Sequence, residues 1–599
     1  MDIFIRVFAS GVKYHLDSIV FPNILFTVSW IAIIITVSCC LKGKAGQIFY
    51  GICFGLFFIM YFAHAIYYPY TGFFFSFKLL QSAEEGIAYV FDTIKQAGLF
   101  SLLSSLLVLI LGILATVKFP RTTKNRIAIL PISLIIFGVV NFHTPTFLGE
   151  ANRSLEWDTW RNPRNVFEDF SDSNKNIKIC GLYEYTVRDL YISFFKPEEK
   201  QTPEEMEFIK QTYGSLTFHE ENEYTGMFKD KNVIFLQLEG IDSWLLNTTD
   251  MPNLTELKKN ALIFDNHYSY YTGGGSTFNS ELAVTTGFLT PISYSKNPYS
   301  FNTNSFPGSL PNQLKNLGYT VNAFHMNSGE YYMREMNYLN WGYDNYYSLM
   351  DEGNYTDISY QLDTELIENE FFYEKMFKQK EPFMNYIISF TTHTPFNLDS
   401  PMAKLLTDKV YGKDGVVPMM NEEYTARFFA AETDRMVGLL MKALEDNGLI
   451  ENTIIVAFAD HYLYTLNDKT ILDKYKRHTD NNLINHTPFF IWSYDMQKKH
   501  IGKVNSQLDI LPTVLNLLGV NFYDEHYIGK DILDDNYSGY VFFSDYSWYD
   551  GVNYVEFGQA SDNTSADTDY INQVNAQINN LIRKNDLTLK YDVFKRRRK

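Results

Sequence analysis

Val233-Ile-Phe-Leu-Gln-Leu-Glu239 is a short apolar run that ends on a carboxylate, and this stretch decides the fold of the larger part of the chain. A second stretch, Thr453-Ile-Ile-Val-Ala-Phe-Ala-Asp-His461, has the same design and ends on an acid and an imidazole. Further apolar runs lie at residues 319–324, 383–390 and 489–492, and helical patterns at 310–317, 424–447 and 510–518. Strands that alternate with helices predict an α/β domain on a largely parallel sheet.

Polar side chains follow these apolar runs closely. In open parallel sheets, ligands bind beyond the carboxyl ends of the strands, so the polar residues there are candidates for a site. They are Glu239, His325, His393, Asp460 and His461. Residues 272–281, Thr-Gly-Gly-Gly-Ser-Thr-Phe-Asn-Ser-Glu, form a Gly-rich turn that would deliver Ser276 and Thr277 at the N-terminus of a helix.

Carboxylates, an imidazole and a hydroxyl together suit a divalent cation such as Mn²⁺, Mg²⁺ or Zn²⁺. A bound cation would lower the pKa of the hydroxyl and make it a nucleophile, and a helix N-terminus would favour an anionic phosphoryl oxygen. Each feature alone has a plainer explanation: a Gly-rich stretch is usually a loop, an Asp-His pair can cap a helix, and a glutamate after a strand is more often solvated. Their combination in one α/β domain favours a functional site.

The first 143 residues contain the long apolar runs. Four of them, at about residues 22–41, 47–68, 98–117 and 126–143, approach or reach the roughly 20 residues that a bilayer crossing needs. The connectors after the first and the third run are basic, and the positive-inside rule places them in the cytoplasm. The chain after the fourth run is then predicted to be extracellular. Residues 3–20 are either an interfacial amphipathic helix or a fifth crossing.

Composition divides the chain further and excludes one class of partner. We expect a transmembrane domain at 1–143, a helical linker at 144–222, a catalytic α/β domain at 223–545 and a C-terminal extension at 546–599. The formal charge is −18, with 69 acidic and 51 basic residues, which argues against nucleic acid as the main partner. The basic tail at 595–599 either contacts anionic lipid or polymer or is a solubilising end.

Several motifs in their order along the chain resemble the lipoteichoic acid synthase family, which belongs to the alkaline phosphatase and sulfatase superfamily. The resemblance covers about residues 232–529. It is carried by the strand that ends at Glu239, the Gly-rich turn with Thr277, His393 in Thr-Thr-His-Thr-Pro-Phe, the strand that ends at Asp460-His461, and Asp509-Ile-Leu-Pro-Thr513. It implies an α-helical transmembrane N-terminal domain followed by an extracellular sulfatase-like α/β domain, in a multi-pass protein of the bacterial cell membrane.

The resemblance also implies roles for single residues. Those that match the metal ligands of the family are Glu239, Thr277, Asp460 and His461, with Thr277 also the nucleophile and Mn²⁺ the usual ion. Those that match its substrate pocket are His325, Arg334 and His393, with Tyr332 where the family commonly has Trp and Asn327 where an acidic residue is expected. Ser276 stands where a basic residue often precedes the nucleophile. These three departures concern the pocket, so the transferred head group can differ from glycerol phosphate.

The residues alone leave some alternatives open. Arg334 can equally form a helix-surface ion pair with Glu330 or Glu335, and His486 is either a site residue or a loop histidine. Residues 509–518 are interpreted as a structural helix. Ser389 occupies the position where a D-x-x-x-H metal motif ending at His393 would need an acid, which favours one metal ion over two.

The resulting hypothesis is a metal-dependent phosphoglycerol transferase that acts on phosphatidylglycerol through a phosphothreonine on Thr277. The acceptor would be a glycolipid or a growing glycerol phosphate polymer. Two alternatives keep the superfamily and change the reaction, a phosphoethanolamine transferase and a phosphodiesterase. A sulfatase is disfavoured, because Ser276 and Thr277 are not followed by the C/S-x-P-x-R pattern. An alternative of another class is a non-catalytic membrane receptor or scaffold.

Overall fold

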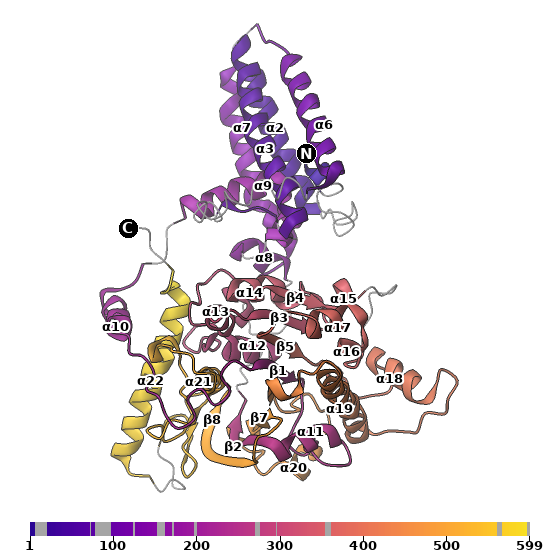
Figure 1. Cartoon of the computed structure of the whole chain (residues 1–599). Coiled ribbons are helices and arrows are strands. Elements are labelled where there is room, and N and C mark those ends of the chain that lie inside the picture. The colour runs from indigo at the N-terminus through magenta and orange to yellow at the C-terminus, as the bar shows by residue number, and fades with distance from the viewer. Residues whose placement is uncertain are drawn as a thin grey trace. The chain divides into compact units, whose positions relative to one another are not determined.

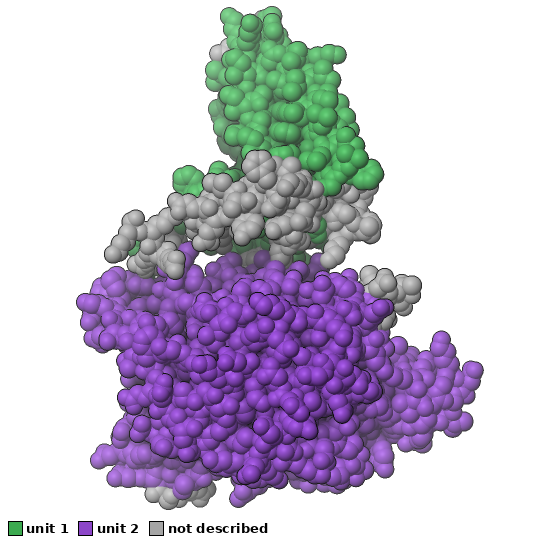
Figure 2. Space-filling view, in the orientation of Figure 1, with its two compact units in different colours: residues 1–153, 159–200 green, residues 154–158, 201–599 purple. Residues whose placement is uncertain are grey.

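The computed structural model describes residues 1–5, 21–71, 74–77, 97–123, 126–152, 162–170, 173–196, 200–269, 276–294, 296–353, 361–559 and 566–595. The chain divides into two compact units (Figure 2), one of residues 1–153 with 159–200 and one of residues 154–158 with 201–599. Three predictions lie partly or wholly outside the described residues. They concern the Gly-rich turn at 272–275, the amphipathic or spanning segment at 3–20, and the basic tail at 595–599.

Unit 1 contains the apolar helices that the sequence predicts (Figure 1). They are α2 (Phe21–Cys40), α3 (Lys44–Thr71), α6 (Gly98–Val117) and α7 (Leu130–His143), with a short α1 (Asp2–Phe4) before them. Within the described residues, four helical stretches are long and apolar enough to cross a membrane. This confirms an N-terminal part made of apolar helices.

Helix α9 (Ser173–Phe194) and the shorter α8 (Pro163–Asp169) belong to unit 1. Both lie in the segment that the sequence predicts to be a linker. Gly181 interrupts α9 with φ +73°, and a Cβ there would lie 2.8 Å from Thr27 Oγ1 of α2. Trp30 Nε1 of α2 donates to Glu184 Oε2 of α9 at 2.8 Å. A glycine is therefore needed where α9 approaches α2 closely.

Unit 2 is built on an eight-stranded sheet with the order β4-β3-β5-β1-β6-β7-β2-β8. The strands are β1 (Asn232–Leu238), β2 (Ala261–Tyr268), β3 (Thr320–His325), β4 (Asn345–Ser348), β5 (Phe383–Ile388), β6 (Thr453–Ala459), β7 (Phe489–Ser493) and β8 (Lys499–Ser506). All neighbours pair in parallel except β7, which is antiparallel to both β6 and β2. Every residue of β1, β5 and β6 is buried, as is typical of strands covered on both faces. The predicted α/β domain on a largely parallel sheet is confirmed.

Helices cover both faces of this sheet (Figure 1). In unit 2 the structure describes α10 (Pro203–Tyr213), α11 (Pro252–Leu257), α12 (Ser276–Thr286), α13 (Leu310–Lys315), α14 (Arg334–Trp341), α15 (Leu349–Glu352), α16 (Glu365–Glu368), α17 (Glu370–Phe377), α18 (Pro401–Tyr411), α19 (Glu422–Asp446), α20 (Thr470–Tyr475), α21 (Gln507–Leu517) and α22 (Thr568–Tyr591). Successive side chains of β1 point to opposite faces of the sheet, so they show which helices cover each face. Ile234 and Leu236 join a core with Phe429 of α19, whereas Gln237 donates to the backbone oxygen of Thr277 in α12.

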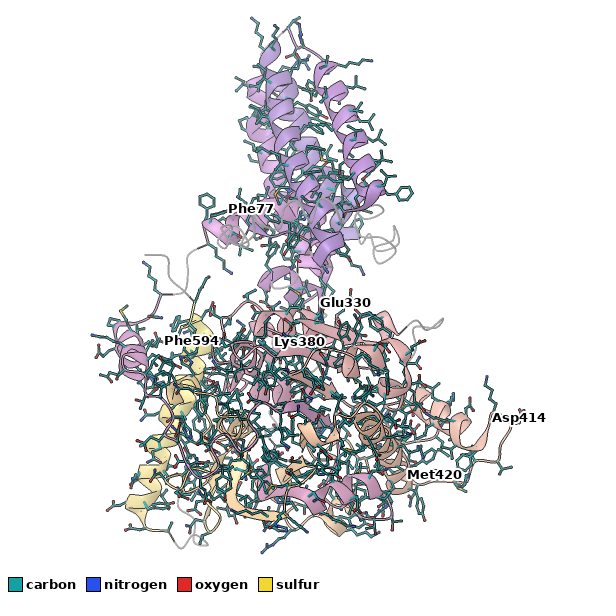
Figure 3. The ribbon with its side chains drawn as sticks, in the orientation of Figure 1. Phe77, Glu330, Lys380, Asp414, Met420 and Phe594 are labelled. Carbon is teal, nitrogen blue, oxygen red and sulfur yellow. The ribbon has the colours of Figure 1, made fainter. Side chains whose placement is uncertain are left out.

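Two features lie at the margins of unit 2. Helix α18 and the segment that carries Asp414 and Met420 extend from the body of the unit (Figure 3), and a small sheet of β9 (Val541–Phe542), β10 (Trp548–Tyr549) and β11 (Tyr554–Val555) precedes α22. Helix α22 supports the segment that follows α12. Asn585 accepts from the backbone N–H of Leu289 at 2.9 Å, and Asp586 accepts from that of Ser293 at 2.6 Å.

His219 ties the start of unit 2 to the segment after α21. Its Nδ1 lies 3.0 Å from Asp524 Oδ1 and its Nε2 3.4 Å from Asp531 Oδ2, and its side chain is only 7% exposed. Burial lowers the pKa of His219, but the two carboxylates outweigh burial and raise the pKa to about 9. The imidazolium therefore stabilises the folded state, an effect that is complete below the ordinary histidine pKa and is lost as the pH rises through about 9.

We expect the free energy of unfolding to fall by about 2 kcal/mol between pH 6.5 and pH 9 because of His219. The measurement is urea unfolding of the detergent-purified chain at pH 6, 7.5 and 9. His219→Gln should flatten this dependence, whereas His500→Gln, at the exposed His500–Asp265 pair, should leave it as in the parent protein. An unchanged pH dependence in His219→Gln would contradict the assignment.

Candidate active site

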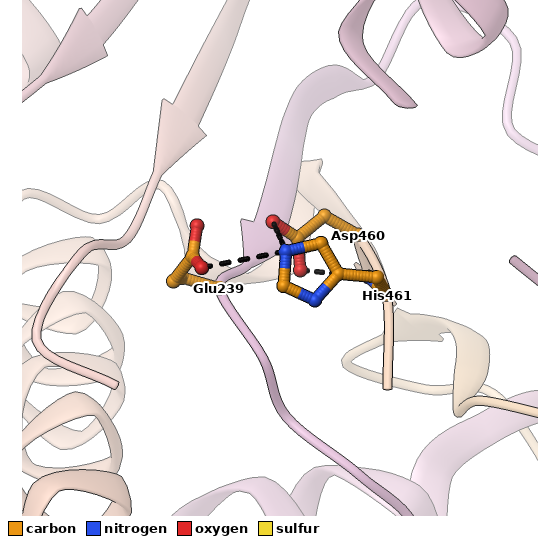
Figure 4. Close-up of side chains that lie close together, drawn as sticks. All are labelled: Glu239, Asp460 and His461. Carbon is orange, nitrogen blue, oxygen red and sulfur yellow. Dashed lines mark hydrogen bonds and ion pairs between the residues drawn. The ribbon is translucent and has the colours of Figure 1, made fainter. Parts of the chain in front are cut away.

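Glu239, Asp460 and His461 meet beyond the carboxyl ends of two central strands of the sheet (Figure 4). Glu239 follows β1 and the other two follow β6, and these strands are parallel neighbours with Leu238 in register with Ala459. All three residues are buried, and one potential ligand atom from each lies within 4.8 Å of the others. His461 Nε2 is 3.5 Å from Glu239 Oε1 and 3.4 Å from Asp460 Oδ2.

Backbone groups fix the orientation of these side chains. Asp460 Oδ1 accepts from the backbone N–H groups of Gly240 and His461, both at 2.8 Å. Asp460 Oδ2 is buried and, among the described residues, has no hydrogen-bond partner. His461 Nδ1 lies 3.0 Å from the backbone oxygen of Tyr462, an arrangement that assigns the proton to Nδ1 and turns the lone pair of Nε2 toward the carboxylates.

This donor set fits a divalent cation. Burial and the neighbouring Asp460 raise the pKa of Glu239, and the hydrogen bond from Thr277 and the positive charge of Arg334 only partly offset that rise. Two buried carboxylates are stable together only with a compensating positive charge or a proton. Two carboxylates and one neutral imidazole are ligands that Mn²⁺ and Zn²⁺ accept in proteins. Glu239, Asp460 and His461 are therefore the residues that would hold the ion.

Thr277 joins this group from α12. Its hydroxyl donates to Glu239 Oε2 at 3.0 Å. It is the second residue of α12, where the first backbone N–H groups of a helix have no partner within the helix and favour an anion. Gln237 Nε2 donates to the backbone oxygen of Thr277 at 3.3 Å and so links the start of α12 to β1.

The two predicted pocket histidines end neighbouring elements of the sheet. His325 is the last residue of β3, and its Nδ1 lies 2.9 Å from the backbone oxygen of Ile388. His393 follows β5, stacks on Phe390 with ring centroids 5.0 Å apart, and has Nδ1 2.7 Å from the backbone oxygen of Thr394. Burial, more than the charge of Arg334, lowers the pKa of both histidines, which favours neutral rings.

The segment that carries His393 rests on a buried acid that the sequence analysis did not identify. Asp363 accepts from the backbone N–H of Phe390 at 2.7 Å and of Thr391 at 3.1 Å, and from the hydroxyl of Thr433 at 2.7 Å. Burial raises the pKa of Asp363 to about 6, although these hydrogen bonds oppose the rise. Asp363 therefore fixes the backbone that leads to His393.

Arg334 is buried and does not form the surface ion pair that was left open. Its side chain is 3% exposed and pairs with Glu281 of α12, with Nη2 2.8 Å from Oε1. Glu330, one of the two surface partners considered, is exposed (Figure 3). That alternative is wrong because α14 turns Arg334 inward, toward the helix that carries Thr277.

The remaining pocket residues have clear local contacts. Tyr332 is buried with φ +57°, and the guanidinium carbon of Arg334 lies 5.1 Å from its ring centroid. Asn327 follows β3, and its Oδ1 accepts from the backbone N–H of Ser328 at 2.8 Å. His486 Nε2 lies 2.8 Å from the backbone oxygen of Asp265, a contact that supports the loop histidine over the site residue. The side chain of Ser276 lies outside what the structure describes.

Known proteins resemble this chain in sequence. The family model described as sulfatase matches residues 231–520. Lipoteichoic acid synthase 2 of Bacillus subtilis is 23% identical over 80% of this chain and 72% of its own length, and the lipoteichoic acid synthase of Staphylococcus saprophyticus is 26% identical over 61% of this chain and 57% of its own length. The chain is thus similar to lipoteichoic acid synthases, and the residues that match the sulfatase model include Glu239, Thr277, Asp460 and His461.

The chain shares its fold with a solved structure. The crystal structure of the lipoteichoic acid synthase LtaP from Listeria monocytogenes matches with a TM-score of 0.52 at 21% identity, over 64% of this chain and 98% of that one. The predicted fold class, apolar helices followed by a sulfatase-like α/β domain, is thereby confirmed. The names of these relatives, lipoteichoic acid synthases, agree with the predicted enzyme class.

Proposed function

We propose that this chain is a member of the lipoteichoic acid synthase family and a membrane-anchored phosphoglycerol transferase that takes its glycerol phosphate group from phosphatidylglycerol. The observation that supports this best is the hydrogen bond from the Thr277 hydroxyl to Glu239. Glu239, with Asp460 and His461, forms the group of side chains that could hold a cation. A nucleophilic hydroxyl beside such a group, at a helix N-terminus, is suited to attack on a phosphate diester. The acceptor would be a glycolipid or a growing glycerol phosphate polymer.

The proposed reaction has two displacement steps. In the first, Thr277 Oγ1 loses its proton and forms a bond to phosphorus while the bond from phosphorus to the diacylglycerol oxygen breaks. The diacylglycerol oxygen takes up a proton and leaves, and a phosphothreonine diester remains. In the second, a hydroxyl of the acceptor gives up its proton and bonds to phosphorus while the bond from phosphorus to Thr277 Oγ1 breaks, and Thr277 regains its hydroxyl proton. When bound at Glu239, Thr277, Asp460 and His461, a divalent cation, Mn²⁺ in preference to Mg²⁺ or Zn²⁺, would lower the pKa of the attacking hydroxyl and offset negative charge.

The chain's own residues would hold the phosphate and move protons. Arg334 supplies N–H donors in a fixed plane that suits phosphate oxygens. His393 is held at Nδ1 by the Thr394 carbonyl, so its Nε2 is free to accept the proton of the acceptor hydroxyl. His325, Tyr332 and Asn327 would line the head group. Because the chain carries a net charge of −18, binding of an anionic lipid must depend on these local groups.

The membrane helices suit a substrate that cannot leave the bilayer. The basic connectors after α2 and α6 argue for cytoplasmic loops, and hence for a multi-pass protein whose catalytic unit is extracellular. We also propose domain boundaries at residues 143, 222 and 545. Residues 162–196, within the proposed linker, pack as part of unit 1.

A second candidate, a phosphoethanolamine transferase, is kept because Asn327 and Tyr332 replace the residues expected in a glycerol-binding pocket. The test is to place the purified full-length chain and Mn²⁺ in vesicles that contain acyl-labelled phosphatidylglycerol or phosphatidylethanolamine. We expect labelled diacylglycerol from phosphatidylglycerol alone. Release from phosphatidylethanolamine alone would replace the proposal by the second candidate, and release from neither lipid would support a non-catalytic receptor or scaffold.

A further inference from the structure

The buried ion pair of Arg334 and Glu281 connects two parts of the site. Glu281 lies on α12, four residues after Thr277, and Arg334 begins α14. The exposed fractions of the two side chains are 3% for Arg334 and 0% for Glu281. A single helix therefore carries both the proposed nucleophile and the anchor of the proposed phosphate-binding arginine.

Glu281 uses both of its carboxylate oxygens on α14. Arg334 Nε donates to Oε1 and Oε2, each at 3.1 Å, and Arg334 Nη2 donates to Oε1 at 2.8 Å. Tyr338, one turn later on α14, donates its hydroxyl to Oε2 at 2.9 Å. Among the described residues, Arg334 Nη1 is buried and has no hydrogen-bond partner. Glu281 therefore fixes two nitrogens of the guanidinium and leaves the third available.

The available nitrogen, Nη1, belongs to the guanidinium of Arg334, whose charge affects two histidines of the site. After burial, which is the larger cause, the positive charge of Arg334 lowers the pKa of His325 and contributes to the lowered pKa of His393. The backbone before Arg334 is held in an unfavourable conformation, with φ +57° at Tyr332 and +52° at Met333. Non-glycine residues keep such angles only where the surrounding structure imposes them, which is common at binding sites.

We propose that Glu281 is a positioning residue that aims Arg334 Nη1 at a phosphate oxygen of the substrate. This rests on the proposed function, since it names the group that orients the phosphate clamp of that reaction. The chemistry recognised is a phosphate anion, either in a lipid head group or free in solution. Because Thr277 and Glu281 share α12, that helix sets the spacing between the nucleophilic oxygen and the nitrogen that holds the phosphate.

A double-mutant cycle on the full-length chain tests the proposal. The variants are Glu281→Gln, Arg334→Met and both together, and the probe is inorganic phosphate, with affinity measured by calorimetry in the presence of Mn²⁺. We expect each single variant to bind phosphate about tenfold more weakly, as for the loss of a hydrogen bond to a charged group. The double variant should bind no more weakly than Arg334→Met, because Glu281 acts through Arg334. With phosphatidylglycerol vesicles, the same variants should raise KM more than they lower kcat.

A milder variant guards against misfolding, since Glu281→Gln leaves a buried arginine without its counter-charge. Tyr338→Phe keeps both charges, and we expect it to weaken phosphate binding about threefold alone and not at all in the Arg334→Met background. Asp250→Asn, which removes a carboxylate from Arg427 on α19, is the matched control and should leave phosphate affinity unchanged.

Two outcomes would overturn the positioning role. One is a lower unfolding temperature of Glu281→Gln and Tyr338→Phe with unchanged phosphate affinity. The other is losses that multiply in the Arg334→Met background. If phosphatidylglycerol is not turned over but the phosphate affinities show the expected coupling, the proposed function fails and the positioning role stands.

Discussion

Replacement of Thr277 by alanine is expected to lower diacylglycerol release from phosphatidylglycerol roughly 10³-fold or more, because the variant lacks the attacking oxygen. The geometry of the site should persist, since the hydroxyl makes one described hydrogen bond, to Glu239 Oε2. The measurement is the initial rate of labelled diacylglycerol formation by the full-length chain in vesicles with Mn²⁺. Thr277→Ser, which restores an oxygen, should recover part of the rate.

The control for this experiment lies on the same helix. Thr286 ends α12 and donates to the backbone oxygen of Leu282 at 2.7 Å, so Thr286→Ala changes the same chemical group away from the proposed cation site. Thr286 is buried, so Thr286→Ala should lower stability somewhat, but it should leave the rate within about twofold because the residue lies nine positions from Thr277 on the helix. The mass of the peptide that contains Thr277, isolated after reaction without acceptor, should increase by one glycerol phosphate group. Diacylglycerol release that survives Thr277→Ala would reject Thr277 as the nucleophile.

Asp460→Asn is expected to weaken Mn²⁺ binding about 100-fold and to abolish activity at micromolar Mn²⁺. The amide oxygen can keep the two backbone hydrogen bonds that Asp460 Oδ1 accepts now. An NH₂ group would replace the buried Oδ2, which accepts no hydrogen bond from a described residue. An NH₂ group cannot bind a cation, so the fold is kept while a ligand is lost. The measurement is Mn²⁺ retained after dialysis, together with activity after chelation and readdition of the metal.

A buried acid elsewhere in unit 2 serves as the comparison. Asp434 of α19 is 2% exposed and accepts from the backbone N–H of Leu254 at 2.9 Å. Asp434→Asn should lower stability but retain Mn²⁺. Equal Mn²⁺ retention by Asp460→Asn and the parent protein would show that the cation does not bind at this group.

Much of the fold could be predicted because the central strands are buried on both faces. Residues 233–238 and 453–458 have no polar side chain except Gln237 and Thr453, and such runs are distinctive at the sequence level. The outermost strands, β4 and β8, could not be predicted for the opposite reason. In β8, Lys499-His-Ile-Gly-Lys-Val-Asn-Ser506, the first residues are mostly exposed, so the strand has no apolar pattern, and β4 has only four residues. The reversed direction of β7 depends on pairing with β6 and β2, which local sequence does not encode.

The site divides in the same way. Glu239, Asp460 and His461 follow recognisable strands, so their meeting beyond the carboxyl ends of these strands could be expected. The pairing of Arg334 with Glu281 could not, because it joins two helices across 53 positions of sequence. One signal was available, namely the four-residue spacing between Thr277 and Glu281, which places both on one side of a helix. Asp363 gave no comparable signal, because its role depends on backbone groups of a distant segment.

The contacts of α22 have a consequence for biosynthesis. Asn585 and Asp586 hold residues 289 and 293, just after the helix that carries Thr277. The ribosome makes this helix long before it makes α22, so a nascent chain that stops short of residue 586 has the proposed nucleophile but lacks this support. Activity should therefore emerge late in translation, after nearly the whole of unit 2 has been delivered and folded.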